Sequence, residues 1–163
     1  MGGAYFKQYA DWNVLCDTEA ADVMFRGVDR LECIGADVTH RAVASDALYD
    51  SLMHYDGTEM GRCYLSKLCS IWRRLCPQAD LVLHDPLVMY YLADPTICAL
   101  KKASVVVITD GYARAMTLNV DAYKKKKYNP SAFADFDDER KVLVAKTVDV
   151  DAFFAYVLRD FEV

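Results

Sequence analysis

The chain has 163 residues, 54% of them hydrophobic and 26% charged, which is a globular composition rather than a disordered one. This length is that of one domain with a real core, so we expect residues 1–163 to form a single unit. The formal net charge of −5 argues against nucleic acid as a partner, because phosphate binding needs a clustered basic surface. The one basic run, the four lysines at 124–127, is typical of a solvated loop.

The six cysteines include no Cys-x-x-Cys pair and no zinc spacing. Most of them have apolar neighbours, as at Cys16 and Cys76, which is typical of small core residues in a reducing compartment. No apolar run reaches the roughly 18 to 20 residues that a membrane span needs, and the N-terminus lacks the features of a signal peptide. We therefore expect a cytoplasmic protein with no membrane partner.

The first half of the chain predicts helices separated by one short strand. Asp17 can cap a helix that carries acidic residues in its first turn and stops at Gly27. Alternation of apolar and polar residues at 31–34 predicts a strand. In chain order we predict a helix over 18–25, a strand over 31–34, a loop over 37–40, and helices over 42–53 and 60–75. In the last helix, one face of period 3.6 holds Tyr64, Leu68, Ile71 and Leu75.

The second half alternates strands with helices and then changes to a hairpin. We predict a strand over 81–83, a helix over 86–92 that ends at Asp94-Pro95, a hairpin from 104–108 and 115–120, a strand over 142–145, and a helix over 150–161. Parallel strands near 31, 81 and 142 are fewer than a doubly wound sheet usually has. The predicted fold class is therefore α/β: part of an open, mostly parallel sheet with flanking helices and a late antiparallel hairpin.

His84 and Asp85 lie between an apolar strand and Pro86, at the predicted start of a helix. Pro86 suits the first helical position, because its φ is fixed and it has no N–H to leave unpaired. One interpretation makes Asp85 the N-cap of this helix and His84 a packed loop residue. The other makes Asp85 a hard oxygen ligand for Ca²⁺ or Mg²⁺ and His84 a general acid or hydrogen-bond donor. The second interpretation needs both residues at the carboxyl edge of a sheet, where α/β folds keep their sites.

Asp11, Trp12 and Asn13 place a carboxylate, an indole and an amide in a row. Such groups can line a sugar or base pocket, since Asp and Asn accept hydroxyls and the aromatic face accepts an apolar ring. A loop with one buried tryptophan explains the same triplet.

Residues 37–40 hold a further histidine. Asp37 or Thr39 can cap the following helix, and His40 either donates to the backbone or takes a catalytic role. No nucleophile elbow, Walker loop, dinucleotide fingerprint or His-Glu-x-x-His is present, so those chemistries have no support.

Taken in order, these pieces resemble the inosine/uridine-preferring nucleoside hydrolase family. The family's Ala-Glu-Phe-Asn, Asp-Pro-Glu-Ala-Ala, Leu-Asp-Val-Thr-His and His-Asp-Pro-Leu motifs are similar to 10–13, 17–21, 36–40 and 84–87. The helix that ends in Asp94-Pro95, the late hairpin and the strand at 142–145 also resemble the family's pattern. The resemblance covers nearly the whole chain.

This resemblance implies an open α/β sheet whose strand ends hold Ca²⁺ and a ribose, and hydrolysis of a nucleoside to ribose and free base. Carried over by position, Asp85 is a metal ligand and His84 lies near the leaving base. Asp11 and Asn13 bind ribose hydroxyls, with Trp12 beside them in the substrate site. The chain departs from the family at Asp11, where the family has the longer Glu.

The largest departure is the aspartate-rich segment that begins family members and supplies most metal ligands. Nothing in residues 1–163 matches it; 135–140 is acidic but differs in order and position. Met1-Gly2-Gly3 resembles a turn that lies mid-chain in the family, so we expect the sequence to be the C-terminal half of a nucleoside hydrolase with little activity alone. The alternative is an inactive homologue that acts as a binding or assembly module. Half a sheet exposes an edge and an apolar face, which favours pairing with another chain. That chain is either a second copy or the missing N-terminal half.

Overall fold

The computed structural model describes residues 10–55, 57–121 and 142–161. The chain divides into two compact units: Met1–Thr39 with Cys98–Val148 is unit 1, and His40–Ile97 with Asp149–Val163 is unit 2. One domain over 1–163 stays a prediction. The lysines at 124–127 and the acidic stretch at 135–140 lie outside the described residues.

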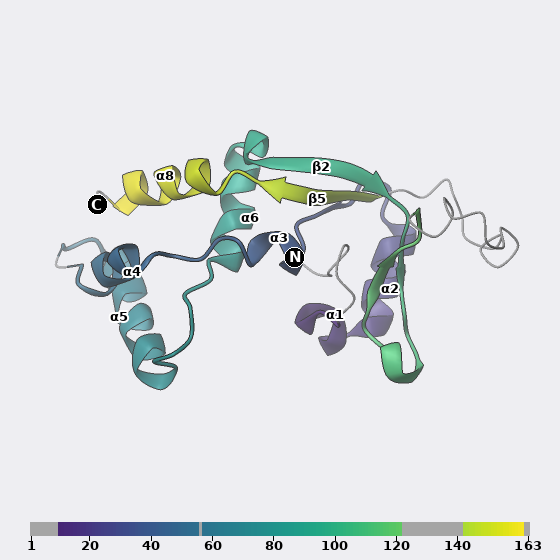
Figure 1. Cartoon of the computed structure of the whole chain (residues 1–163), viewed down its shortest axis with the longest axis horizontal. Helices are drawn as coiled ribbons and strands as arrows, with labels where there is room; N and C mark the ends of the chain where they lie inside the picture. Colours follow the sequence, from purple (N-terminus) through teal and green to yellow (C-terminus); the bar gives the residue numbers. More distant parts are fainter. Residues whose placement is uncertain (1–9, 56, 122–141, 162–163) are drawn as a thin grey trace, which may run out of the picture. The chain divides into compact units, whose positions relative to one another are not determined.

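Unit 1 contains a three-stranded sheet in the order β1-β5-β2. Figure 1 shows β2 beside β5. Two of the three predicted parallel strands are confirmed: β1, Glu32–Cys33, pairs in parallel with β5, Val142–Val148. The strand β2, Cys98–Ala103, pairs antiparallel with β5 along its length and was not predicted. Two adjacent lysines interrupt any alternation in β2, so pairing with β5, distant in the chain, is what makes it a strand.

The predicted hairpin is confirmed in unit 1. Strand β3, Val105–Val107, pairs antiparallel with β4, Thr117–Asn119. A 3₁₀ turn, η2, Gly111–Ala113, lies between them. Gly111 has a φ of +71° and Ala115 a φ of +68°, so the chain reverses through two residues in the left-handed region.

Three helices complete the described part of unit 1. Helix α2, Thr18–Gly27, is confirmed, and the Asp17 side chain accepts a hydrogen bond from the backbone of its first turn. The helix α3, Ala36–Thr39, replaces the loop predicted over 37–40, and the helix α1, Trp12–Cys16, replaces the loop that was one interpretation of 11–13. The core of the unit contains residues of α1, α2, β1, β2, β3 and β5 and of the turn before β4. They are Val14, Phe25, Cys33, Ala103, Val107, Ala115, Val142 and Val144.

In unit 2, helix α5, Met60–Leu75, has its predicted bounds, whereas α4, Asp46–Met53, begins later than the predicted residue 42. Ser45 caps α4 by accepting a hydrogen bond from the Leu48 N–H at 3.2 Å. Tyr49 links α4 to α5, because its hydroxyl donates to the Cys69 carbonyl at 3.3 Å.

The apolar face of α5 predicted from the sequence is not covered. Tyr64 is 65% exposed and Leu75 69% exposed, with Leu68 and Ile71 also exposed. This face has the width of a buried helix stripe, yet Ser66 and Cys69 are the buried residues of α5.

The helix α6, His84–Ala93, ends at its C-cap Asp94, as predicted. The 3₁₀ turn η1, Pro95–Ile97, follows it. Helix α8, Val150–Phe161, is also confirmed and packs on α6. The Tyr156 hydroxyl of α8 donates to the Asp94 carboxylate at 2.5 Å. With parallel and antiparallel strands and flanking helices, the α/β class is confirmed. Within the described residues no helix is long and apolar enough to cross a bilayer.

Candidate functional site

The N-terminus of α6 differs from the sequence prediction in the residue that caps the helix. The N-cap is Leu83, which makes no side-chain capping hydrogen bond, and His84 is the first helical residue. The interpretation of Asp85 as the N-cap is therefore wrong, and Pro86 is the third helical residue rather than the first. Asp85 is exposed within the first turn, where the helix dipole stabilises a carboxylate.

The chain before α6 is held against the chain before α4. The Leu83 N–H donates to the Ala42 carbonyl at 2.8 Å, and the Ala44 N–H donates to the Leu81 carbonyl at 2.9 Å. Val43 and Val82 form an isolated antiparallel bridge between these bonds. The stretch 81–83 is thus not the parallel strand that was predicted.

This antiparallel pairing brings two histidines together. The rings of His40 and His84 lie with centroids 5.1 Å apart and an interplanar angle of 73°, a T-shaped arrangement. His84 is half-buried and His40 is exposed. Sequence reasoning treated these histidines separately, and only the pairing of 42–44 with 81–83 shows that they are neighbours.

In unit 1 the Asp11 carboxylate caps α1. Its Oδ1 accepts hydrogen bonds from the Asn13 N–H at 2.9 Å and the Val14 N–H at 3.4 Å. The residue is only 7% exposed, so the capped start of the helix is buried in unit 1. Asp11 keeps Oδ2 for another partner, because a carboxylate has two acceptor oxygens.

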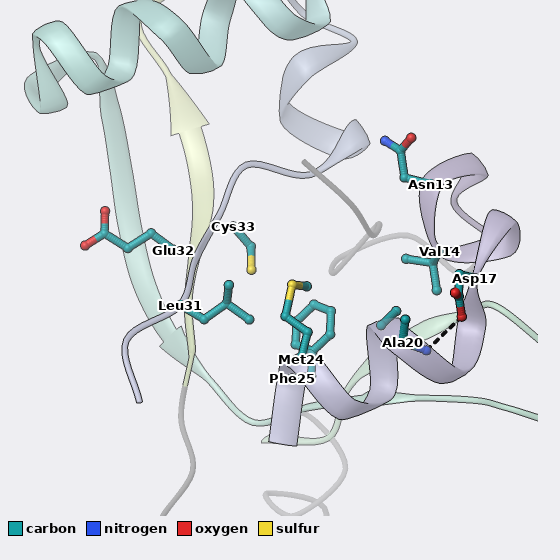
Figure 2. A pocket seen from close by; sticks show the side chains of 10 residues that line it. Asn13, Val14, Asp17, Ala20, Met24, Phe25, Leu31, Glu32 and Cys33 are labelled. Carbon is teal, nitrogen blue, oxygen red and sulfur yellow. Dashed lines mark hydrogen bonds between the residues drawn. The ribbon is translucent and has the colours of Figure 1, made fainter. Parts of the chain in front are cut away.

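Trp12 and Asn13 are both exposed, and the idea of a buried tryptophan is wrong, since Trp12 is 76% exposed. Asn13 lies at a cavity of about 320 Å³ between α1, α2 and β1 (Figure 2). The capping residue Asp17 adds a carboxylate to its lining, whereas the Glu32 side chain extends away from the cavity and accepts hydrogen bonds from Arg30. Its apolar lining is made of Val14, Ala20, Ala21, Met24, Phe25, Leu31 and Cys33. A cavity with this mixed lining suits a small molecule that has polar and apolar faces.

The described residues do not make a metal centre. Nowhere among them do three or more His, Cys, Asp or Glu side chains gather so as to hold a metal ion. Ca²⁺ takes six to eight oxygens, so Asp85 alone does not fit it. Any calcium at Asp85 would need ligands from outside the described residues.

The five residues predicted for the site fall into two groups. Asp11, Trp12 and Asn13 are consecutive in unit 1, and His84 and Asp85 are consecutive in unit 2. The structure brings His40 to the second group, a residue that the sequence motif did not connect with it.

Comparison with known proteins finds nucleoside hydrolases and nucleosidases that resemble this chain. The chain is 29% identical to uridine nucleosidase 1 of Arabidopsis thaliana, over 96% of this chain and 48% of that protein. It is 25% identical to the inosine-uridine preferring nucleoside hydrolase of Crithidia fasciculata, over 99% of this chain and 50% of that one. The chain therefore spans about half the length of these relatives.

The fold is also found in a solved plant nucleoside hydrolase. That structure matches with a TM-score of 0.77 and 25% sequence identity, over 98% of this chain and 51% of its own. The family model for inosine-uridine preferring nucleoside hydrolases matches residues 1–155, which is nearly the whole sequence. With the motifs, the fold and this match in agreement, the chain belongs to the inosine-uridine preferring nucleoside hydrolase family.

Proposed function

We propose that this chain supplies one part of a site that hydrolyses the N-glycosidic bond of purine or pyrimidine ribonucleosides, giving ribose and the free base. The observation that supports it best is the family match over residues 1–155. The half-buried imidazole of His84 at the first residue of α6 adds a group suited to proton transfer. We place the reaction in the cytoplasm.

The reaction adds water across the bond between C1′ and the base nitrogen. The water oxygen bonds to C1′, the electron pair of the breaking bond goes to the base, and the base takes a proton. His84 donates that proton to the leaving base. In this proposal the general base that takes the proton from water is a carboxylate outside the described residues, and within those residues no group of three or more His, Cys, Asp or Glu side chains could hold a metal ion.

The residues of unit 1 bind the sugar in this proposal. Asp11 accepts a ribose hydroxyl at Oδ2, because Oδ1 already holds the α1 cap. Asn13 binds a second hydroxyl through its amide, and Trp12 offers an exposed ring for an apolar face of the substrate. Asp85 would be one of several Ca²⁺ ligands, the rest coming from outside the described residues.

A steady-state assay with inosine and uridine in the presence of Ca²⁺ tests the proposal. We expect the chain alone to turn over slowly or not at all, and addition of a separately expressed aspartate-rich N-terminal half of a relative to restore turnover. His84→Ala and Asp85→Ala are expected to abolish the restored activity, with His54→Ala as the matched control. Full activity of the chain alone would contradict the division of the site into halves, and restored activity that survives His84→Ala would contradict its role.

The exposed apolar face of α5 favours a second candidate, an inactive assembly module. Tyr64 and Leu75 are each about two-thirds exposed, and an apolar stripe of this kind usually marks a contact. Sizing by light scattering separates the two functions. A stable oligomer of the chain that binds no nucleoside supports the module, whereas a complex with the N-terminal half that gains activity supports the hydrolase.

A further inference from the structure

The contact between His40 and His84 is built by the backbone. The residue pair Val43–Val82 fixes an antiparallel register, and two hydrogen bonds of 2.8 and 2.9 Å flank it. His40 stands three residues before Val43, and His84 two residues after Val82. In an antiparallel pair such positions lie at the same end, so the register itself carries the two imidazoles to one place.

We propose that His40 is a positioning residue for His84, holding its imidazole in one rotamer through the T-shaped ring contact. The ring centroids are 5.1 Å apart at 73°, within the range that aromatic pairs favour. The second restraint is the helix, because His84 is the first residue of α6 and its backbone is already ordered. With its main chain fixed and one side of its ring covered, His84 loses the rotation that would carry its N–H away from a leaving group.

The catalytic meaning of this restraint rests on the proposed function. A general acid works only when its proton lies within hydrogen-bond reach of the atom that leaves. An imidazole that samples several rotamers therefore transfers its proton to the leaving base poorly. His40 takes no part in the proton transfer. It acts only through the orientation of His84.

The ring contact is tested first, without any activity. The chain has three histidines, so selective labelling resolves His40, His54 and His84 by NMR. We expect contacts between the His40 and His84 ring protons, and side-chain couplings at His84 that indicate a single rotamer. His40→Ala should give averaged couplings at His84, whereas His40→Phe, which keeps a ring, should leave them unaveraged. His54→Ala is the matched control. Unchanged couplings in His40→Ala, with an intact backbone spectrum, would overturn the proposal.

The kinetic test uses two ribosides in the chain completed as described for the hydrolase assay. Inosine needs its base protonated, whereas 4-nitrophenyl riboside has a leaving group that departs without a proton. We expect His40→Ala to lower kcat for inosine by about tenfold with KM changed less than about twofold, and to leave the nitrophenyl riboside unaffected. His40→Phe should restore kcat for inosine. Equal losses with both substrates would show a structural role only. If neither is hydrolysed by the unmutated protein, the proposed function fails, and the NMR couplings still decide the positioning.

Discussion

Glu19 and Arg114 form a two-pronged ion pair that ties helix α2 to the end of the β3–β4 turn. Arg114 Nη1 lies 2.6 Å from Glu19 Oε1, and Nη2 lies 2.8 Å from Oε2. The two residues are 95 positions apart, and the pair adds a polar link beside the apolar core of unit 1. The pKa of Glu19 is lowered to about 2, first by the hydrogen bonds from the Arg114 guanidinium, then by a hydrogen bond from its own backbone, with a smaller effect of the Arg114 charge.

This pair predicts an acid-sensitive link in unit 1. Because the pKa of Glu19 falls from 4.5 to about 2 on folding, its contribution to stability is complete above pH 4.5. The contribution is lost as the pH falls from 4.5 through about 2. Urea unfolding across this range should show the original chain more stable than Glu19→Gln near neutral pH, with the difference closing in acid and in high salt.

The control is Glu59→Gln, which removes the ion pair with Arg62 within one turn of α5. It joins no two elements of the fold and should change stability less than Glu19→Gln. An unfolding difference for Glu19→Gln that stays constant down to pH 2 would contradict the lowered pKa.

The cap that Asp11 forms at the start of α1 predicts how substitutions at Asp11 change stability. Asp11→Ala removes the acceptor of two N–H groups at the start of α1, so the free energy of unfolding should fall by about 1 kcal/mol. Asp11→Asn keeps an oxygen in place and should lose only a few tenths of that. Ser45→Ala, which removes the cap of α4, is the matched control in unit 2. Equal destabilisation by Asp11→Asn and Asp11→Ala, measured by urea unfolding, would show that the charge rather than the cap matters.

Two glycines predict opposite effects of the same substitution. Gly61 lies in the first turn of α5 with open space where a methyl group would stand, so Gly61→Ala should stabilise the chain by about 0.5 to 1 kcal/mol. Gly111 has equal space but a φ of +71°, so Gly111→Ala should destabilise by about 1 to 2 kcal/mol. Thermal or urea unfolding checks both, and effects of the same sign would contradict the backbone argument.

The cysteines predict an order of reactivity. Burial raises the pKa of the Cys98 thiol to about 11 and also raises that of Cys69, so few thiolates form there in the folded chain. Cys16 is exposed on α1. Mass spectrometry after brief alkylation should find Cys16 modified first and Cys98 modified only after urea is added, with Cys16→Ser removing the fast phase. Rapid labelling of Cys98 without denaturant would show that unit 1 opens readily.

Elements with strong local signals were predictable from the sequence. The 3.6-residue period and length of α5 and α8 indicate helices wherever they lie, and the β-branched run before Asp110-Gly111 indicates a hairpin. The motifs at 10–13, 36–40 and 84–87, with their order, indicate the family that the match over residues 1–155 shows. Local periodicity and motif order do not depend on distant partners, which is why the sequence was sufficient for them.

Tertiary structure decided what depends on distant partners. Strand β2 and the extended stretch 42–44 exist because β5 and 81–83 supply their hydrogen bonds, and propensity alone favoured neither. Next to the pairing of 42–44 with 81–83, α6 begins at His84, Leu83 rather than Asp85 is the N-cap, and the rings of His40 and His84 meet. The sequence by itself determined the family, the α/β class and the long helices, since these follow from local pattern. Only the fold decided which side chains meet, because long-range backbone pairing sets register and register sets neighbours.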